Sequence, residues 1–400
     1  MASLAFNLLA RDPASNARAG RMTTPHGEIR TPVFMPVGTQ ATVKTLTPEE
    51  LEAAGAQIIL GNTYHLFLRP GHALIREMGG LHGFMNWRRP LLTDSGGYQV
   101  FSLSDLKSIQ EEGVTFQSHI DGSRHLFTPE SVMEIETALG ADIIAPLDEC
   151  PPYPCDYGYA KDSAALTLRW AERSQKRFDE LEGERAHPQA LFGIVQGSVY
   201  EDLRVDCARS LVDRGFDAYA IGGMSIGEPK SAMADLIDAT VEHLPEDRPR
   251  YLMGAGTPED LVDAVGRGID MFDCVIPTRE GRNGALYTRS GRINIYNARF
   301  RADDGPIDSS CSCYACRTFS RSYIRHLYRA GEILGPRMGT LHNIHFYVGL
   351  VSEMRKAILE GRFGAWSRSF LTAYRSETAR SETARSETAR SETARKEQPQ

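Results

Sequence analysis

Three cysteines crowd into six residues of the chain, where Cys311, Cys313 and Cys316 form a C-x-C-x2-C motif. His342 follows 26 residues after the last of them, and His326 and His345 lie nearby as competing imidazoles. Three thiolates and one imidazole suit a closed tetrahedral zinc site, which has no open position for a substrate water. The spacing therefore predicts one structural Zn2+ per chain, held by Cys311, Cys313, Cys316 and His342.

The other four cysteines, Cys150, Cys155, Cys207 and Cys274, lack metal-binding spacing and are expected in the core or in a pocket. The total of seven cysteines is odd, and in a reducing compartment metal binding is expected rather than disulfides. The N-terminal residues carry no basic leader and no cleavage-like site, and no apolar run approaches the roughly 20 residues of a membrane span. We expect a cytoplasmic protein with no membrane partner.

A second set of residues suited to chemistry follows the short apolar runs of the first 277 residues. These polar and glycine clusters are Asp94-Ser95-Gly96-Gly97, Asp148-Glu149-Cys150, Gln196-Gly197, Gly222-Gly223 and Gly254-Ala255-Gly256. Any one of them fits an ordinary turn between a strand and a helix. Glycines also let a backbone approach a ligand closely, and barrel enzymes place their active sites at the carboxyl ends of the strands. Five such clusters predict a ligand site at that end.

The elements that must position these clusters alternate along the chain. Eight strands are predicted at Val33–Gly38, Ile58–Asn62, Leu91–Thr93, Asp142–Asp148, Leu191–Gln196, Ala218–Ile221, Arg250–Gly254 and Met271–Pro277. Amphipathic helices are predicted between several of them, at Pro129–Leu139, Lys161–Leu181, Tyr200–Arg214, Lys230–His243 and Pro258–Arg267. Alternation of this kind indicates parallel β/α units, and eight units over about 250 residues suit a (β/α)8 TIM barrel. An open, doubly wound sheet is the alternative.

The character of the sequence changes after Pro277. Residues 278–337 contain eleven arginines and no lysine against five acidic residues, in a chain whose net charge is −7. This segment also holds the cysteine motif, and a helical stretch is predicted at Asn343–Leu359. We therefore expect a barrel domain at 1–277 and a zinc-binding subdomain with a C-terminal helix at 278–374. Residues 375–400 form a low-complexity tail with four Ser-Glu-Thr-Ala-Arg repeats, which contain no large apolar residue and are expected to be disordered.

Taken together, these residues resemble the bacterial-type tRNA-guanine transglycosylase (queuine tRNA-ribosyltransferase) family. The resemblance runs in order from about Phe6 to Tyr374. Its main motifs are Asn62-Thr63-Tyr64-His65-Leu66, Asp94-Ser95-Gly96-Gly97-Tyr98-Gln99, Asp148-Glu149-Cys150, Gly193-Ile194-Val195-Gln196-Gly197, Gly222-Gly223, Met253-Gly254 and Phe272-Asp273-Cys274-Val275-Ile276-Pro277-Thr278-Arg279. The resemblance implies a (β/α)8 barrel with a zinc subdomain and a pentosyltransferase that exchanges bases in tRNA without ATP.

The resemblance also implies the catalytic pair. Cleavage of a purine glycosidic bond develops positive charge on the ribose and negative charge on the leaving base, so a nucleophilic carboxylate and a second acid/base group are needed. By resemblance, Asp273 is the nucleophile and Asp94 is the general acid/base. Alone, Asp94 would fit a helix N-cap and Asp273 an ordinary strand-end carboxylate.

The same resemblance implies a guanine pocket. Asp148 would accept hydrogen bonds from the base, Gln196 and the Gly222-Gly223 backbone would donate to it, and Ser95 would add one more bond. Tyr98 and Met253 would enclose the flat ring. The bulk of Cys150 and Ile226 resembles bacterial members, which accept the small base preQ1.

The expected partners are guanine, preQ1 and a tRNA with a GUN anticodon, whose wobble guanine is replaced in queuosine biosynthesis. By resemblance, Arg279 and Arg282 contact the bases flanking that guanine, other arginines hold phosphates, and the chain forms a homodimer. Two alternatives remain: a non-catalytic RNA-binding subunit of the same fold, which should lack the paired aspartates, and a related enzyme that inserts deazapurines into DNA.

Overall fold

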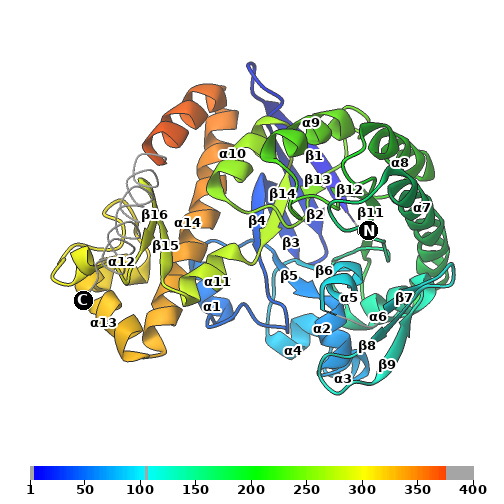
Figure 1. Ribbon diagram of the computed structural model, residues 1–400, viewed down its shortest axis with the longest axis horizontal. Coiled ribbons are helices and arrows are strands. Elements are labelled where there is room, and N and C mark those ends of the chain that lie inside the picture. Colours follow the sequence, from blue (N-terminus) through cyan, green and yellow to red (C-terminus); the bar gives the residue numbers. More distant parts are fainter. Residues whose placement is uncertain (1–3, 104–106, 375–400) are drawn as a thin grey trace, which may run out of the picture. The chain divides into compact units, whose positions relative to one another are not determined.

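The structure, a computed structural model, describes residues 4–103 and 107–374. Eight short parallel strands, almost all of whose residues are buried, form one sheet in the order β4-β14-β13-β12-β11-β10-β6-β5 (Figure 1). They are β4 (Val33–Pro36), β5 (Ile59–Asn62), β6 (Leu91–Asp94), β10 (Ile143–Ile144), β11 (Ala190–Val195), β12 (Ala218–Ile221), β13 (Arg250–Leu252) and β14 (Met271–Cys274).

The sheet closes on itself. The two outermost strands in that order, β4 and β5, are joined by a parallel bridge between Val37 and Leu60, and the amide of Gly38 donates a hydrogen bond of 2.6 Å to the carbonyl of Leu60. A closed sheet of eight parallel strands is a barrel, so the predicted (β/α)8 fold is confirmed and the open sheet is excluded.

All eight predicted strands exist, but several were predicted too long, two of them by three residues or more. The strand predicted at Asp142–Asp148 pairs only at Ile143 and Ile144, because the chain then leaves the ladder and carries Asp148 and Glu149 into a loop. The strand predicted to reach Pro277 ends at Cys274, and α11 (Ile276–Arg282) begins two residues later. Pro277 has no amide hydrogen for a ladder, whereas proline is well tolerated in the first turn of a helix.

The predicted helices lie outside the strands, as Figure 1 shows for α7 to α10. They are α6 (Pro129–Leu139), α7 (Tyr157–Glu180), α8 (Glu201–Arg214), α9 (Lys230–Val241) and α10 (Pro258–Gly266). Helix α7 begins four residues before the predicted start because the side chain of Asp156 accepts a hydrogen bond of 2.9 Å from the amide of Tyr159. Thr128 and Thr257 cap α6 and α10 in the same way.

Shorter elements surround the two ends of the barrel. The helices are α1 (Pro48–Ala53), α2 (Thr63–Leu68), α3 (His72–Glu77), α4 (Gly80–Met85), α5 (Gly97–Leu103) and the 3-10 turn η1 (Glu182–Glu184). An antiparallel sheet, β7 (Lys107–Ile109), β8 (Val114–Gln117) and β9 (Arg124–Phe127), precedes α6.

A second antiparallel sheet covers the end of the barrel at which the strands begin. It contains β1 (Ala5–Arg11), β2 (Arg18–Thr24) and β3 (Gly27–Thr31). Its Met22 and Ile29 belong to the same fully buried cluster as Met35, Phe192 and Met271 from the barrel strands. The centre of this end is filled by apolar side chains, whereas Asp94, Asp148 and Asp273 lie toward the opposite end, where the strands finish.

The chain divides into two compact units. The first contains residues up to Val275 together with Val351–Phe363, and the second contains Ile276–Leu350 with the residues from Gly364 onward. The sequence-based division after residue 277 did not include the return of Val351–Phe363 to the barrel unit. Besides α11, the second unit contains β15 (Ala285–Thr288), β16 (Gly291–Asn294), η2 (Ala298–Phe300), α12 (Tyr314–Thr318), α13 (Arg321–Ala330) and the first part of α14 (Leu334–Leu359).

The sequence also predicts a disordered tail and the absence of a membrane span. The repeat tail at 375–400 lies outside the described residues. Among the helices that the structure describes, none combines the length and the apolar character needed to cross a bilayer.

Candidate functional site

Asp94 lies at the carboxyl end of β6 and is almost fully buried. Its Oδ2 accepts hydrogen bonds from Asn62 Nδ2 at 2.5 Å and from Gln99 Nε2 at 2.9 Å, and its Oδ1 accepts one from the amide of Thr63 at 3.0 Å. Burial raises the pKa of Asp94 to about 6, although these three donors favour the ionised form and oppose the shift. A carboxyl group with such a pKa can both give and take a proton near neutral pH.

Asp273 lies at the carboxyl end of β14. Its Oδ1 accepts hydrogen bonds from the hydroxyl of Tyr251 at 2.6 Å and from the amide of Gly254 at 2.8 Å. Burial raises its pKa as well, and its negative charge contributes to the raised pKa of Asp94. The fold thus brings together two acids that are 179 positions apart in the sequence.

A second polar network surrounds Asp148. Its Oδ1 accepts a hydrogen bond of 2.7 Å from the hydroxyl of Ser95, and its Oδ2 accepts one of 2.7 Å from Nε2 of Gln196. Burial raises the pKa of Asp148, and both donors oppose that rise. The Oε1 of Gln196 is buried and has no hydrogen-bond partner. A buried polar atom without a partner costs stability, so Gln196 is arranged for something other than packing alone.

The Gly222-Gly223 turn packs directly on Gln196. A Cβ on Gly222 would lie 2.8 Å from Nε2 of Gln196, and a Cβ on Gly223, whose φ is +63°, would lie 2.4 Å from its Oε1. Only glycine fits this close approach. On the other side of the turn, the fully buried Arg204 donates hydrogen bonds of 3.1 Å to the carbonyls of both glycines and one of 2.6 Å to the carbonyl of Ser198.

For three further residues of the predicted pocket, the structure gives the burial of the side chain. Cys150 is buried, and the charge of Asp148 contributes to raising the pKa of its thiol to about 12, an effect due mainly to burial. Met253 is partly buried against the core of the barrel. Tyr98, in the first turn of α5, is 52% exposed. The enclosure of a base by Tyr98 and Met253 remains a prediction.

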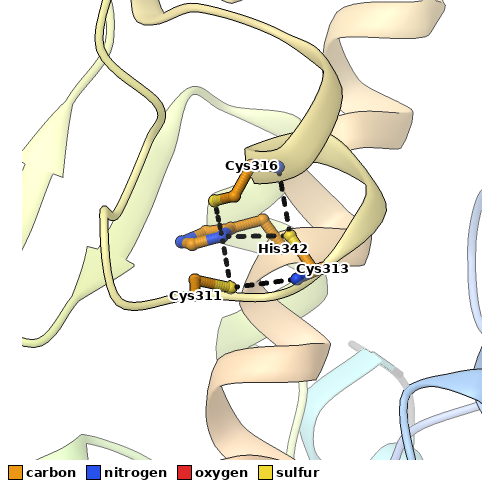
Figure 2. Close-up of side chains that lie close together, drawn as sticks. All are labelled: Cys311, Cys313, Cys316 and His342. Atoms are coloured by element: carbon orange, nitrogen blue, oxygen red, sulfur yellow. Dashed lines mark hydrogen bonds between the residues drawn. The ribbon is translucent and has the colours of Figure 1, made fainter.

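Cys311, Cys313, Cys316 and His342 form the predicted cluster in the second unit, with all four possible ligand atoms within 4.8 Å of one another (Figure 2). Nδ1 of His342 lies 3.7, 3.6 and 3.3 Å from the sulfurs of Cys311, Cys313 and Cys316. A tetrahedral ion with typical zinc bond lengths would separate sulfur and nitrogen ligands by about 3.6 Å. The four residues therefore fit a metal ion.

The surroundings of the cluster favour the same conclusion. Nε2 of His342 lies 2.7 Å from the carbonyl oxygen of Tyr287, so this nitrogen carries the proton and Nδ1 presents its lone pair to the sulfurs. The sulfurs of Cys311 and Cys313 accept hydrogen bonds from the amides of Cys313 and Cys316. His345 contacts Cys311 at 3.6 Å but does not belong to the set of four.

Most of the chain matches known proteins. The family model described as queuine tRNA-ribosyltransferase matches residues 12–376. A protein of that name from Thermoanaerobacter pseudethanolicus is 56% identical over 378 residues, which cover 94% of this chain and 98% of the relative. Proteins of the same name from Caldanaerobacter subterraneus and Symbiobacterium thermophilum are 55% and 56% identical over 374 residues, 94% of this chain and 98% and 92% of the relatives.

This chain belongs to the queuine tRNA-ribosyltransferase family. The resemblance found in the sequence is confirmed, and with it the prediction of a pentosyltransferase. The roles of individual residues remain predictions. Of the two arginines predicted to bind tRNA, Arg279 is exposed and Arg282 is half-buried on α11, where burial and the charge of Arg279 lower the pKa of Arg282.

Sequence reasoning did not assign roles to four residues that this member of the family uses to build the site. Asn62 and Gln99 lie within the quoted motifs and hold Asp94, whereas Tyr251 and Arg204 lie outside them and hold Asp273 and the glycine turn. The sequence pattern could have indicated Arg204, because it lies on the face of α8 that carries the buried Leu203, Cys207 and Ala208. An arginine on an apolar helix face needs a buried partner.

Proposed function

We propose that this enzyme exchanges guanine for preQ1 at the wobble position of tRNAs with a GUN anticodon. The observation that carries the proposal is the pairing of two acids, the buried Asp94 and the partly buried Asp273, at the carboxyl end of one barrel. Two carboxyl groups whose charges interact and whose surroundings differ suit a double displacement, in which one attacks and the other transfers the proton.

In the first step, an oxygen of Asp273 forms a bond to the ribose C1′ as the bond from C1′ to the guanine nitrogen breaks. Both hydrogen bonds to Asp273 fall on Oδ1, which leaves Oδ2 as the attacking oxygen. The base leaves with the electron pair, and Asp94 supplies the proton that neutralises it. The RNA strand stays intact as a ribosyl ester of Asp273.

In the second step, preQ1 gives up a proton to Asp94 and its ring nitrogen attacks C1′, which releases Asp273. Two displacements at one carbon retain the configuration, as in retaining glycosidases. The raised pKa of Asp94, about 6, supports both proton transfers, since neither its acid nor its base form is rare near neutral pH.

Recognition of the base is assigned to the network around Asp148. Its remaining lone pairs would accept from N1–H and the 2-amino group of guanine, while the second hydrogen of Gln196 Nε2 and the amide of Gly223 would donate to O6. Adenine presents the opposite pattern at these edges and would leave buried groups unpaired, at about 1–3 kcal/mol for each. Cys150, buried beside Asp148, limits the room for larger incoming bases such as queuine.

The remaining assignments rest on family membership and on charge. Arg279 and Arg282 would contact the bases next to the target guanine, which must leave its stack to enter the pocket. The four-residue cluster would hold Zn2+, and a closed site of this type contributes to folding and supplies no step of the exchange. A homodimer and a cytoplasmic location complete the proposal.

The test uses labelled guanine, preQ1 and an unmodified tRNA with a GUN anticodon. The unaltered enzyme should incorporate guanine and then release it in exchange for preQ1. The Asp273→Ala variant should bind the tRNA with unchanged affinity and lose exchange completely. Quenching the unaltered enzyme in denaturant should trap an RNA–protein adduct on Asp273. Ordinary exchange by Asp273→Ala, or an adduct on another residue, would refute the proposed roles.

A further inference from the structure

A second group of possible metal ligands lies in the barrel unit, at the opposite end of the strands from Asp94 and Asp273. His26, His82 and His187 each offer a ring nitrogen within 4.8 Å of the others. His26 lies in the turn between β2 and β3, His82 lies in α4, and His187 lies shortly before β11. They meet around Asp142, the residue before β10, at the end of the barrel where strands begin.

Asp142 is completely buried and fixes the orientation of one of these rings. It accepts hydrogen bonds from Nδ1 of His26 at 2.8 Å, from the amide of the same residue at 3.2 Å and from the amide of Leu91 at 2.9 Å. Because Nδ1 of His26 donates its proton to a carboxylate, the lone pair of this imidazole is on Nε2. A carboxylate behind a histidine is the usual arrangement that orients metal-binding imidazoles.

His82 is oriented in the same sense. Its Nδ1 lies 2.9 Å from the carbonyl of Trp87, which accepts its proton. Its Nε2 then carries a lone pair and is buried without a hydrogen-bond partner. This nitrogen lies 3.3 Å from Oδ2 of Asp142, so in the neutral ring one acceptor faces another, a conflict that either a proton on His82 or a bound cation removes. A cation at this point would satisfy both.

Both ring nitrogens of His187 face carbonyl oxygens. Its Nδ1 lies 3.1 Å from the carbonyl of Pro188, and its Nε2 lies 3.2 Å from the carbonyl of Gly140. A neutral imidazole can donate from only one of these nitrogens, so the other nitrogen faces a carbonyl with a lone pair. Turning that nitrogen toward His26 and His82 removes the conflict.

The approach to His187 is open and acidic. His187 lines a cavity of about 620 Å3, which is also lined by Asp179, Glu182 and Asp217 with Arg185. Three carboxylates against one guanidinium favour the entry of a cation. The cavity thus supplies a path from solvent to the ring of His187.

We propose that His26, His82 and His187 form a second metal site, for a divalent transition ion such as Zn2+, Co2+ or Ni2+. Imidazole nitrogens select this class of ion over Mg2+ and Ca2+, which prefer oxygen ligands. The rings of His26 and His82 stack with centroids 3.6 Å apart, so binding turns the His82 ring about its χ2 angle, which gives up its hydrogen bond to the carbonyl of Trp87, until both lone pairs meet. That torsion is broad in histidine. The bound ion would join the β2–β3 turn, α4 and the segment before β11.

The test is a titration of the full-length enzyme, already loaded with zinc at its cysteine site, with Co2+. We expect one additional equivalent of Co2+ per chain, with visible bands of nitrogen and oxygen ligation and without the charge-transfer band of thiolate ligands. The additional equivalent should also raise the midpoint of thermal unfolding, because an ion that binds only the folded chain stabilises it.

The variants His26→Asn and His187→Asn should each lose the additional equivalent and its thermal shift, while they keep the zinc at the cysteine site and base exchange. His243→Asn, outside the cluster, serves as the matched control and should bind Co2+ like the unaltered chain. Absence of a second equivalent in the unaltered chain would overturn the proposal. Binding that is equal in all three variants would show adventitious surface binding and would also overturn it.

Discussion

The hydroxyl of Tyr251 donates a hydrogen bond of 2.6 Å to Oδ1 of Asp273. The two residues lie on the neighbouring strands β13 and β14, and the amide of Gly254 adds a second donor to the same oxygen. Burial raises the pKa of Asp273, whereas the two hydrogen-bond donors lower it. The donors thus favour the ionised form, which a nucleophile needs. In the proposed reaction, Tyr251 would therefore prepare Asp273 for attack on the ribose.

Replacing Tyr251 with Phe should slow base exchange by about tenfold to a hundredfold, since a hydrogen bond to a charged group contributes about 1.5–3 kcal/mol. The rate of adduct formation on Asp273, followed by denaturing gels, should fall by the same factor while tRNA affinity is unchanged. Tyr219→Phe, on the adjacent strand β12, is the control. If both variants slow the adduct equally, the hydrogen bond is not responsible.

The pKa of Asp94 should set an inflection near pH 6 in the pH dependence of kcat/KM for exchange. Gln99 donates to the ionised form of Asp94, and removing that donor disfavours ionisation. In Gln99→Leu the inflection should therefore move to higher pH, whereas Gln110→Leu, on an exposed loop, should leave it in place. A shift to lower pH in Gln99→Leu would contradict the assigned role of that donor.

Arg204 should control the affinity for the free base through the Gly222-Gly223 turn, whose carbonyls it holds. Arg204→Met leaves these carbonyls unpaired, at about 1–3 kcal/mol for each buried group, and should weaken guanine binding about tenfold or more. Arg204→Lys should recover part of the loss because it restores a buried donor. Titration calorimetry with guanine measures this effect, and the affinity for tRNA should change little. Guanine affinity equal to that of the unaltered enzyme in Arg204→Met would disprove the coupling.

The fourth metal ligand can be decided by a pair of variants. His342→Ala should lose the bound metal and lower the unfolding midpoint, because three thiolates then remain without their imidazole partner. His345→Ala should keep the metal, although His345 lies only 3.6 Å from the sulfur of Cys311. Metal content by elemental analysis distinguishes them, and the reverse result would assign the site to His345.

The sequence by itself determined the repeating features of this protein. Buried parallel strands read as short apolar runs and their helices as amphipathic stretches, so all eight strands were found from local pattern. The three cysteines lie within one short loop and helix, so their meeting is also decided locally. The clusters that follow the strands were expected to share one end of the barrel because parallel strands all finish there.

Only the tertiary structure decided which residues support the site and where the elements stop. Tyr251 reaches Asp273 and Arg204 reaches the glycine turn through contacts that no spacing in the sequence encodes. The pairing of β10 with β11 ends after Ile144, and Val351–Phe363 belongs to the barrel unit. Both depend on partners from distant parts of the chain. The tautomer with which His342 faces the three sulfurs depends on the carbonyl of Tyr287, 55 residues away. Local pattern predicts an element's type, whereas a hydrogen-bond partner is set by how the closed barrel and the second unit fold.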